Sequence, residues 1–372
     1  MELKIPTPRT FSFRRTVASH GWYQLLPFAL DTKEWQLTRV IDLGEKPPVT
    51  IFMDGLKNHV RVSAARPLTE SDAAIVLRDA RHILRLDDDL RQFYVVTDND
   101  PEFSWVSQQG AGRLLRSPTV FEDLVKMICT TNCSWALTLK MVTGMVENLG
   151  RETGDGRRSF PTPEYLAAMP LKFFVDEVRA GYRAPYLKEL SDRVASGELN
   201  VEAWLTSELP TAELIKQIKG VKGVGPYAAE NLLKLLGRYD GLALDSWTRA
   251  KFFEIRNNGR KANDKKIARY LLTLQRVARP RALVRRDPRL AITTNAQKAH
   301  KEISEARLIL LCFMCLFVAN SSLWLLVEDH RRVLRAAWTF RVAHDRQHFS
   351  IGRKRKLVAR SYRDFAAILC LE

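Results

Sequence analysis

The stretch from Thr211 to Trp247 constrains the fold of this chain more than any other segment. Apolar residues recur at helical spacing on both sides of the turn Gly223-Val224-Gly225, which predicts two helices joined by a tight hairpin. Pro226 follows in the first turn of the second helix, where proline is tolerated best. A helix N-terminus beside a glycine turn offers backbone N–H groups to a phosphate. Asp245 lies twenty residues after Gly225, at the start of a further predicted helix.

These residues resemble the signature of the helix-hairpin-helix DNA glycosylases, a superfamily that includes endonuclease III and the glycosylases for adenine, 8-oxoguanine and 3-methyladenine. The resemblance implies that Asp245 is the catalytic aspartate. It also implies that the backbone at Gly223 and Gly225 binds a DNA phosphate, with Lys222 adding positive charge. A second interpretation stays open, because an aspartate before a helix is often only an N-cap and many such hairpins bind DNA without catalysis.

The position two residues after Gly225 separates two branches of this superfamily. Bifunctional members carry a nucleophilic lysine there, and this chain has Tyr227. Without that amine there is no Schiff base, so the resemblance implies a monofunctional glycosylase without a lyase step by this route. Tyr227 and Trp247 lie close to the hairpin and the aspartate in the sequence, and we expect both to line the base pocket by stacking.

The resemblance also bears on cofactors. It implies a monovalent cation held by backbone carbonyls around Lys219, Val221 and Val224, and no other cofactor. Some relatives hold an iron–sulfur cluster on four closely spaced cysteines, a pattern that is not found in this sequence. Its five cysteines are odd in number and unevenly spread, which favours a reducing compartment over a disulfide framework. They are Cys129, Cys133, Cys312, Cys315 and Cys370.

Two further segments resemble the 8-oxoguanine glycosylases. In ICTTNCSW, Asn132 falls where those enzymes place an asparagine that faces DNA, and an amide can hydrogen-bond the base left unpaired by flipping. In AGYRAPY, the resemblance implies that Tyr182 wedges into the base stack and Arg183 reaches toward the orphaned base. Structural roles stay open: a helix-end cap for Asn132, core packing for Tyr182 and a surface ion pair for Arg183.

Other positions depart from the 8-oxoguanine enzymes. Leu137 replaces an arginine that contacts the orphaned base, and Thr10 replaces a glycine that helps those enzymes read the oxidised purine. Leu137 argues against a strict preference for one opposite base. Thr10, together with Tyr227 in place of the lysine, favours an alkylated purine over an oxidised one as the substrate, and the weak N-glycosidic bond of such a base demands less of the pocket.

The first hundred residues predict strands followed by a helix. Alternating or β-branched runs at 35–42, 49–53 and 60–64 are bounded by glycine and proline turns. A helix then begins after Thr69 or Ser71. We therefore predict an α+β chain, mainly α-helical: an N-terminal antiparallel sheet domain over residues 1–105, and a helix-hairpin-helix glycosylase core over residues 106–270.

The net charge of +17 suggests a nucleic-acid partner, but the charge is unevenly placed. Residues 271–372 contain 20 Lys and Arg against 8 Asp and Glu, a net charge of +12 that leaves +5 for residues 1–270. The prediction of DNA binding therefore depends on the hairpin motif.

Residues 271–372 form an atypical tail of uncertain structure. Relatives end instead on a tyrosine, a proline–phenylalanine pair and a tryptophan-bearing helix. Removing one nucleotide after codon 270 restores such an ending for suitable synonymous codons, so we interpret the tail as a frameshifted extension. Two alternatives stay open for the apolar run 308–327: a membrane span, which polar residues at its centre disfavour, or part of a buried helix pair.

Together these features predict a monofunctional glycosylase of base excision repair that acts as a monomer on damaged double-stranded DNA. The alternatives are a non-catalytic DNA-binding protein and a glycosylase disabled by its C-terminus. The first ten residues are polar and contain proline, unlike a signal peptide. We expect the bacterial cytoplasm or a eukaryotic nucleus, without secretion and without a membrane partner.

Overall fold

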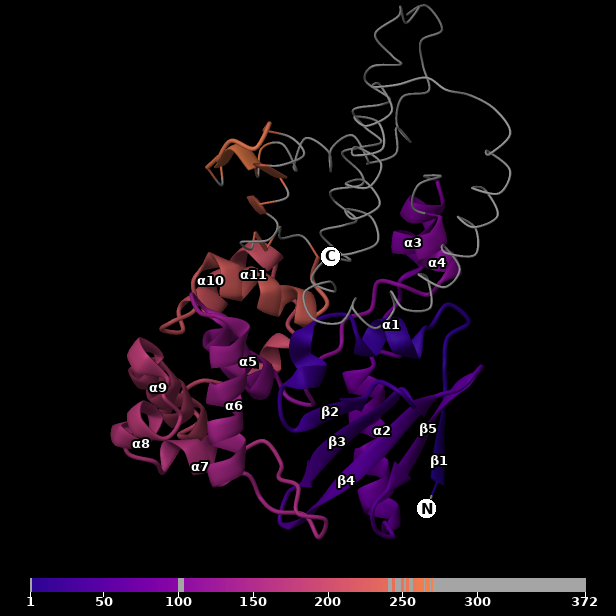
Figure 1. Cartoon of the computed structure of the whole chain (residues 1–372), viewed down its shortest axis with the longest axis vertical. Helices are drawn as coiled ribbons and strands as arrows, with labels where there is room; N and C mark the ends of the chain where they lie inside the picture. Colours follow the sequence, from indigo (N-terminus) through magenta and orange to yellow (C-terminus); the bar gives the residue numbers. More distant parts are fainter. Residues whose placement is uncertain are drawn as a thin grey trace, which may run out of the picture.

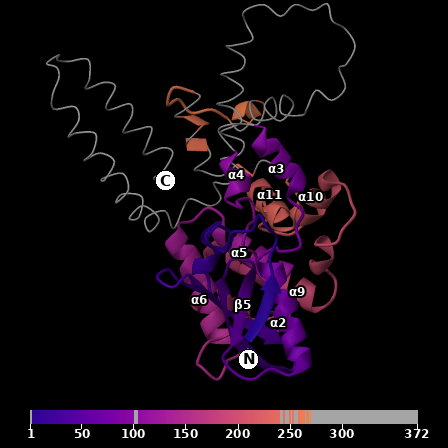
Figure 2. The same cartoon turned by 90° about the vertical axis from the view of Figure 1, so that its right-hand side faces the viewer.

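The computed structural model describes residues 2–99, 104–239, 243–244, 249–250, 252–253, 257–263, 265–267 and 269. Asp245, Trp247 and the predicted tail at 271–372 lie outside these residues. Figure 1 shows a sheet at one end of the molecule and a group of helices beside it. Two of these helices, α10 and α11, lie beside one another and well away from the N-terminus in both views (Figure 1, Figure 2).

Five antiparallel strands form a single sheet in the order β1-β5-β4-β3-β2. The predicted strands at 35–42, 49–53 and 60–64 correspond to the three middle strands of this sheet, which confirms the antiparallel sheet domain. The strands are β1 Glu2–Pro6, β2 Phe28–Asp31, β3 Gln36–Leu43, β4 Lys46–Gly55 and β5 His59–Ala64.

The helix α2, Glu70–Ile83, packs on the sheet. Of the two capping residues considered from the sequence, Thr69 is the N-cap, and its hydroxyl accepts a hydrogen bond from the backbone N–H of Asp72 at 3.2 Å. Val76, Ala80 and Ile83 recur at helical spacing and are fully buried against the strands. The sheet and α2 therefore form one two-layer unit.

The helical half surrounds α5, Val120–Thr130, which is buried along nearly its whole length. Helix α5 contacts α6 and α11, and α9 packs against α7 and α8. The other helical bounds are α1 Phe13–Val17, α3 Arg91–Asp98, α4 Trp105–Gln108, α6 Trp135–Leu149, α7 Pro163–Ala167, α8 Leu171–Asp176, α9 Ala184–Ala195, α10 Thr211–Lys219 and α11 Pro226–Leu235, with 3-10 turns η1 Gly21–Gln24, η2 Gly181–Arg183 and η3 Glu202–Trp204. The predicted mainly helical α+β architecture is confirmed.

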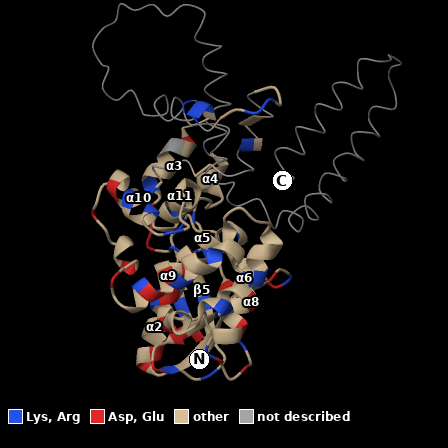
Figure 3. Ribbon diagram, turned by 90° about the vertical axis from the view of Figure 1, so that its left-hand side faces the viewer, with Lys and Arg blue, Asp and Glu red and all other residues tan. Residues whose placement is uncertain are grey.

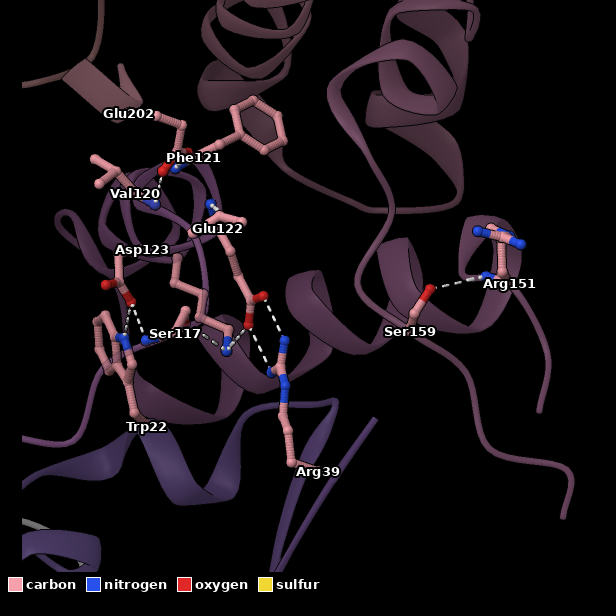
Figure 4. Close-up of polar contacts among 12 residues, drawn as sticks. Trp22, Arg39, Ser117, Val120, Phe121, Glu122, Asp123, Arg151, Ser159 and Glu202 are labelled. Atoms are coloured by element: carbon pink, nitrogen blue, oxygen red, sulfur yellow. Dashed lines mark hydrogen bonds and ion pairs between the residues drawn. The ribbon is translucent and has the colours of Figure 1, made fainter. Parts of the chain in front are cut away.

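A buried ionic contact joins the sheet to α5 (Figure 4). The Arg39 guanidinium on β3 donates to both oxygens of Glu122, at 2.8 and 2.6 Å, and the Lys126 ammonium donates to Glu122 Oε1 at 2.6 Å. Burial alone would raise the pKa of Glu122, but the two cations outweigh it and lower that pKa to about 2. Glu122 is therefore ionised at neutral pH.

Three further hydrogen bonds fix the N-terminal half of α5 (Figure 4). The Trp22 indole donates to Asp123 Oδ1 at 2.7 Å. The carboxylate of Glu202 accepts the N–H groups of Val120 and Phe121, each at 2.9 Å, and so satisfies two donors that a helix N-terminus leaves without intrahelical partners. Helix α5 is thereby held from the sheet side and from η3, and it forms the support against which α6 and α11 pack.

Candidate active site and nucleic-acid interface

The predicted glycine hairpin is present between α10 and α11. Gly223 has a φ of +84°, a left-handed conformation that favours glycine. Val221 and Val224 are almost completely buried, and the Val224 N–H donates to the Val221 carbonyl at 3.1 Å. The turn is therefore tight and fixed to the core on one side, with its glycine backbone on the other.

Gly225 is the N-cap of α11, with Pro226 as the first helical residue. Its backbone is extended, with φ −82° and ψ −178°, and a side chain added to Gly225 would meet nothing within 4 Å. Backbone N–H groups in the first turn of a helix have no intrahelical acceptors and carry partial positive charge. The open space at Gly225 is consequently suited to the close approach of an anion.

Asp245 lies outside the described residues, but the chain just before it does not. Ala243 and Leu244 are buried, and Ala243 has a φ of +43°. The Ala243 N–H donates to Glu230 Oε2 on α11 at 2.5 Å. Helix α11 thus holds the backbone two residues ahead of the predicted catalytic aspartate, through a residue that the sequence analysis did not single out.

Asn132 and Tyr182, predicted from separate segments, lie together at the end of α5. Asn132 is exposed, in a left-handed conformation with φ +45°, two residues past the end of the helix. Its side-chain amide donates to the Tyr182 hydroxyl at 3.4 Å, and that hydroxyl donates to the Thr131 carbonyl at 3.3 Å. Tyr182 is 51% exposed, so most of its ring is not packed into the core as the structural alternative had it.

Arg183 is buried directly beneath this pair. Its guanidinium lies 4.3 Å from the centre of the Tyr182 ring, and its Nε donates to the Thr131 hydroxyl at 3.2 Å. A second bond runs from Arg183 Nη2 to the Thr131 carbonyl. In this structure Arg183 supports the exposed tyrosine from below, and its predicted reach toward an orphaned base stays a prediction.

The charges near the hairpin are mixed in sign. The Lys222 ammonium forms an ion pair with Glu189 of α9 at 2.7 Å, although the lysine side chain is 65% exposed. Both signs of charge occur along α9 and α10 (Figure 3). Recognition of DNA on this side would therefore depend on the hairpin backbone and on Lys222 exchanging its carboxylate partner for a phosphate.

The comparisons with known proteins agree with this geometry. No protein-family model matches the chain. The N-glycosylase/DNA lyase of Saccharomyces cerevisiae is 28% identical over 174 residues, which cover 42% of this chain and 45% of that protein, less than half its length. The apo 8-oxoguanine glycosylase/lyase of Clostridium acetobutylicum superposes with a TM-score of 0.58 and 20% identity, over 84% of this chain and 96% of that one. The 3-methyladenine DNA glycosylase of Archaeoglobus fulgidus gives a TM-score of 0.58 at 18% identity, over 85% and 98%.

The chain has the fold of the helix-hairpin-helix DNA glycosylases. The resemblance predicted from the hairpin motif is thereby confirmed. The Clostridium protein has also been solved with double-stranded DNA that carries cytosine opposite 8-oxoguanine, and that complex superposes with a TM-score of 0.57 at 20% identity, over 84% of this chain and 96% of that one.

Tyr227 occupies the second residue of α11 within this glycosylase fold and is half-buried. Its carbonyl accepts a hydrogen bond from the Asn231 side chain at 2.9 Å, which fixes the first turn of the helix. A phenol in this position cannot form the imine that an amine forms with a sugar aldehyde. Trp247, the other residue expected to line the base pocket, lies outside the described residues.

The C-terminus of α11 is held by two arginines that the sequence analysis missed. Arg85, directly after α2, donates from Nη1 to the Lys234 carbonyl at 2.8 Å, and Arg116 Nη1 donates to the Leu235 carbonyl at 3.1 Å. Cations at the end of a helix satisfy its last carbonyls and its dipole. These contacts span more than a hundred residues of sequence, so no local pattern could have revealed them.

The described residues offer carbonyl oxygens at the hairpin but no cluster of metal-binding side chains. Within the described part of the chain, no group of three His, Cys, Asp or Glu side chains could hold a metal ion. The carbonyls of the predicted cation site come from Lys219, which ends α10, and from the buried turn residues Val221 and Val224. Oxygen donors of this kind suit a hard cation, and the Val221 carbonyl keeps a second lone pair beside the hydrogen bond it accepts.

The predictions about the cysteines and the apolar run at 308–327 concern residues that are only partly described. Burial raises the pKa of the Cys129 thiol to about 12, so it stays protonated at neutral pH, whereas Cys312, Cys315 and Cys370 lie beyond the described residues. None of the described helices is long and apolar enough to cross a membrane. The apolar run at 308–327 lies outside the described residues.

Proposed function

We propose that this chain is a monofunctional DNA glycosylase, which hydrolyses the N-glycosidic bond of a damaged purine in double-stranded DNA. The observation that carries the proposal is the exposed Tyr182, held by Asn132 and Thr131 and linked through α9 to the glycine hairpin. A glycosylase must grip the backbone and fill the space that a flipped base leaves. The hairpin offers the first of these functions and the tyrosine the second.

Phosphate binding falls to the hairpin. Backbone N–H groups near Gly223 and Gly225 would receive a DNA phosphate, and Lys222 would contribute charge once released from Glu189. The carbonyls of Lys219, Val221 and Val224 would hold a monovalent cation that screens the turn. These contacts are made to the DNA backbone and carry no base specificity. They determine only the position of the duplex on the protein.

Base extrusion falls to the residues at the end of α5 and in η2. The Tyr182 ring would replace part of the stacking that is lost when the damaged nucleotide leaves the helix. The amide of Asn132, already beside the ring, would hydrogen-bond the base left behind, whereas Arg183 would reach that base only by giving up its hydrogen bonds to Thr131. Leu137 cannot supply the donors of an arginine, so discrimination among opposite bases would be weak.

Bond cleavage falls to Asp245. Departure of the base builds positive charge on the sugar, and an ionised carboxylate in a water-poor cleft stabilises that charge and orients the attacking water. Tyr227 and Trp247 would stack on the extruded base. The yeast relative is named a lyase, whereas Tyr227 has no amine with which to form a Schiff base, so strand cleavage is not part of the proposal.

An alkylated purine is the substrate that fits these residues best. A cationic alkylated base is already a good leaving group and needs less help from the pocket. Tyr227 in place of the lysine and Thr10 in place of the glycine also depart from the 8-oxoguanine enzymes. An oxidised purine is the second candidate, favoured by the ICTTN and GYR segments.

The test is base release from duplexes that carry an alkylated purine, 8-oxoguanine or hypoxanthine, with the unaltered chain and with Asp245→Asn. We expect strand breaks only after hot alkali, and a loss of release of about 10²–10³-fold in the variant with unchanged DNA affinity. Asp176→Asn, an exposed carboxylate on α8, is the matched control and should be neutral. Unchanged DNA affinity without release by any chain would instead indicate a binding protein or a disabled glycosylase, and breaks without alkali would contradict the monofunctional assignment.

A further inference from the structure

We infer that Tyr186 is a positioning residue, which couples the glycine hairpin to the exposed ring of Tyr182. The inference rests on the proposed function, since it assigns the step at which Tyr186 acts. Tyr186 is the third residue of α9 and is half-buried between the two elements. Its role is to hold the phosphate-binding turn and the wedge at one fixed separation.

The contact with the hairpin is made through Gly223. A Cβ added to Gly223 would lie 2.6 Å from Tyr186 Cδ2 and 3.0 Å from its Cγ. The glycine backbone therefore lies directly against the Tyr186 side chain, closer than a residue with a Cβ would allow. Gly223 is needed twice, once for its left-handed φ of +84° and once for this approach.

The contact with the wedge is made on another side of the same ring. The centroids of Tyr182 and Tyr186 lie 6.1 Å apart at an interplanar angle of 74°, the edge-to-face arrangement that aromatic pairs prefer. The Tyr182 ring is thus held at three places: by Tyr186, by the Arg183 guanidinium and through its hydroxyl by Thr131. Removing Tyr186 would take away the aromatic support of the ring, which could then tilt about its remaining contacts with Arg183 and Thr131.

A second link ties the hairpin to the same helix. Glu189 lies three residues after Tyr186 on α9 and pairs with Lys222, the residue before Gly223, at 2.7 Å. This link is exposed and would be given up when a phosphate takes Lys222, whereas the stacked Gly223–Tyr186 contact needs no charge. The aromatic contact is therefore the one that persists in the DNA complex.

This arrangement assigns Tyr186 to base extrusion and not to first contact with DNA or to bond cleavage. The hairpin fixes the position of the DNA backbone, and the Tyr182 ring must enter the base stack at a set distance from the bound phosphate. A wedge that tilts enters the stack less often, which slows extrusion while leaving the phosphate contacts of the hairpin in place.

The test is a double-mutant cycle with Tyr186→Leu, Tyr182→Ala and both together, and Tyr186→Phe as the conservative control. Extrusion is followed by the fluorescence of 2-aminopurine placed beside an alkylated purine, and cleavage by single-turnover base release. Tyr186→Leu should slow both about three- to tenfold, with the dissociation constant for undamaged duplex changed less than about twofold. Tyr186→Phe should behave like the unaltered chain.

The cycle decides whether Tyr186 acts through Tyr182. Once Tyr182 is alanine, adding Tyr186→Leu should slow extrusion less than about twofold, because the ring it positions is gone. The inference would be overturned if the two substitutions slowed extrusion by factors that multiply in the double variant. It would also be overturned if Tyr186→Leu weakened binding of undamaged duplex as much as it slowed extrusion. Fluorescence changes without base release would overturn the proposed activity alone, and no fluorescence change with the unaltered chain would overturn both. Thermal unfolding of each variant identifies any general loss of structure.

Discussion

Glu230 accepts a hydrogen bond from the backbone N–H of Ala243 at 2.5 Å, and so fastens the chain before Asp245 to the middle of α11. The same helix carries the glycine hairpin at its N-terminus and Tyr227 in its first turn. Helix α11 therefore carries the hairpin proposed to bind phosphate and the tyrosine proposed to line the base pocket, and it also holds the backbone ahead of the predicted catalytic aspartate.

Removing the Glu230 carboxylate should slow base release more than it weakens DNA binding. A hydrogen bond to a charged group contributes about 1.5–3 kcal/mol, so we expect Glu230→Ala to lower the single-turnover rate about 10- to 100-fold. Glu230→Gln keeps an acceptor oxygen and should lose less. Glu213→Ala, an exposed carboxylate on α10, is the control. Equal rates for the two alanine variants would contradict a positioning role for Glu230.

The two hairpin glycines should respond in opposite ways to substitution. Gly223→Ala combines a left-handed φ with a Cβ 2.6 Å from Tyr186, and should lower the free energy of unfolding by about 1–3 kcal/mol. Gly225→Ser places a preferred N-cap residue in open space, and should leave stability unchanged or slightly higher while weakening DNA binding by crowding the phosphate. Urea unfolding and DNA titration check both. Normal DNA affinity in Gly225→Ser would argue against a phosphate at this N-terminus.

Removing one partner of the buried contact between Arg39 and Glu122 should lower the free energy of unfolding more than removing all of the charges together. Glu122→Leu leaves Arg39 and Lys126 buried without a carboxylate, and should cost about 3–5 kcal/mol of unfolding free energy. Replacing all three residues by apolar ones should recover much of that loss. Glu198→Gln, in an exposed pair with Arg193, should change stability by less than about 1 kcal/mol. Similar costs for Glu122 and Glu198 would show that the buried contact is not stabilising.

Stability should fall between pH 7 and pH 5 because His20 is buried uncharged. Its Nε2 lies 2.6 Å from the Leu115 carbonyl and donates to it, and burial lowers the His20 pKa from 6.5 to about 4. Below pH 6.5 the unfolded chain therefore binds a proton that the folded chain does not, so stability drops with falling pH by up to about 1.4 kcal/mol per unit. Burial also lowers the pKa of His82, to about 3, which adds to the slope.

Replacing the imidazole separates the contribution of His20 from that of His82. His20→Gln keeps a side-chain N–H for the Leu115 carbonyl but cannot titrate, and should flatten the slope of urea-derived stability between pH 7 and pH 5. The carboxylate of Glu122 does not interfere, since its contribution is lost only below about pH 4.5. An unchanged slope in His20→Gln would mean that folding does not shift the pKa of His20.

The sequence predicted those parts of the fold that local patterns encode. The hairpin followed from Gly223 and Gly225, and the helix start after Thr69 or Ser71 followed from their place before an amphipathic pattern, with the structure selecting Thr69 as the cap. Strands β1 and β2, ELKIP and FALD, were missed because they are short and contain one β-branched residue between them, Ile5. Their pairing with β5 and β3 is a long-range property of the sheet.

The candidate site likewise contains residues that sequence motifs predicted and residues that they did not. Asn132 and Tyr182 were predicted separately from motifs, and the structure brings them into contact. Tyr186 and Glu230 were missed because their partners, Gly223 and Ala243, lie where the chain folds back on itself. Asp245 and Trp247 keep the roles that the resemblance implies, as predictions.

The two arginines at the C-terminus of α11 limit how this chain can be divided. Arg85 comes from the sheet domain predicted for residues 1–105, and Arg116 from the following core. A fragment that begins at residue 106 would remove the Arg85 guanidinium from the Lys234 carbonyl, which also accepts the Gly237 N–H, and would expose the α5 surface that Arg39 covers. Any shortened version intended for crystallisation or for transplanting the hairpin onto another protein must therefore keep the sheet half, since the hairpin helix ends on a residue supplied by it.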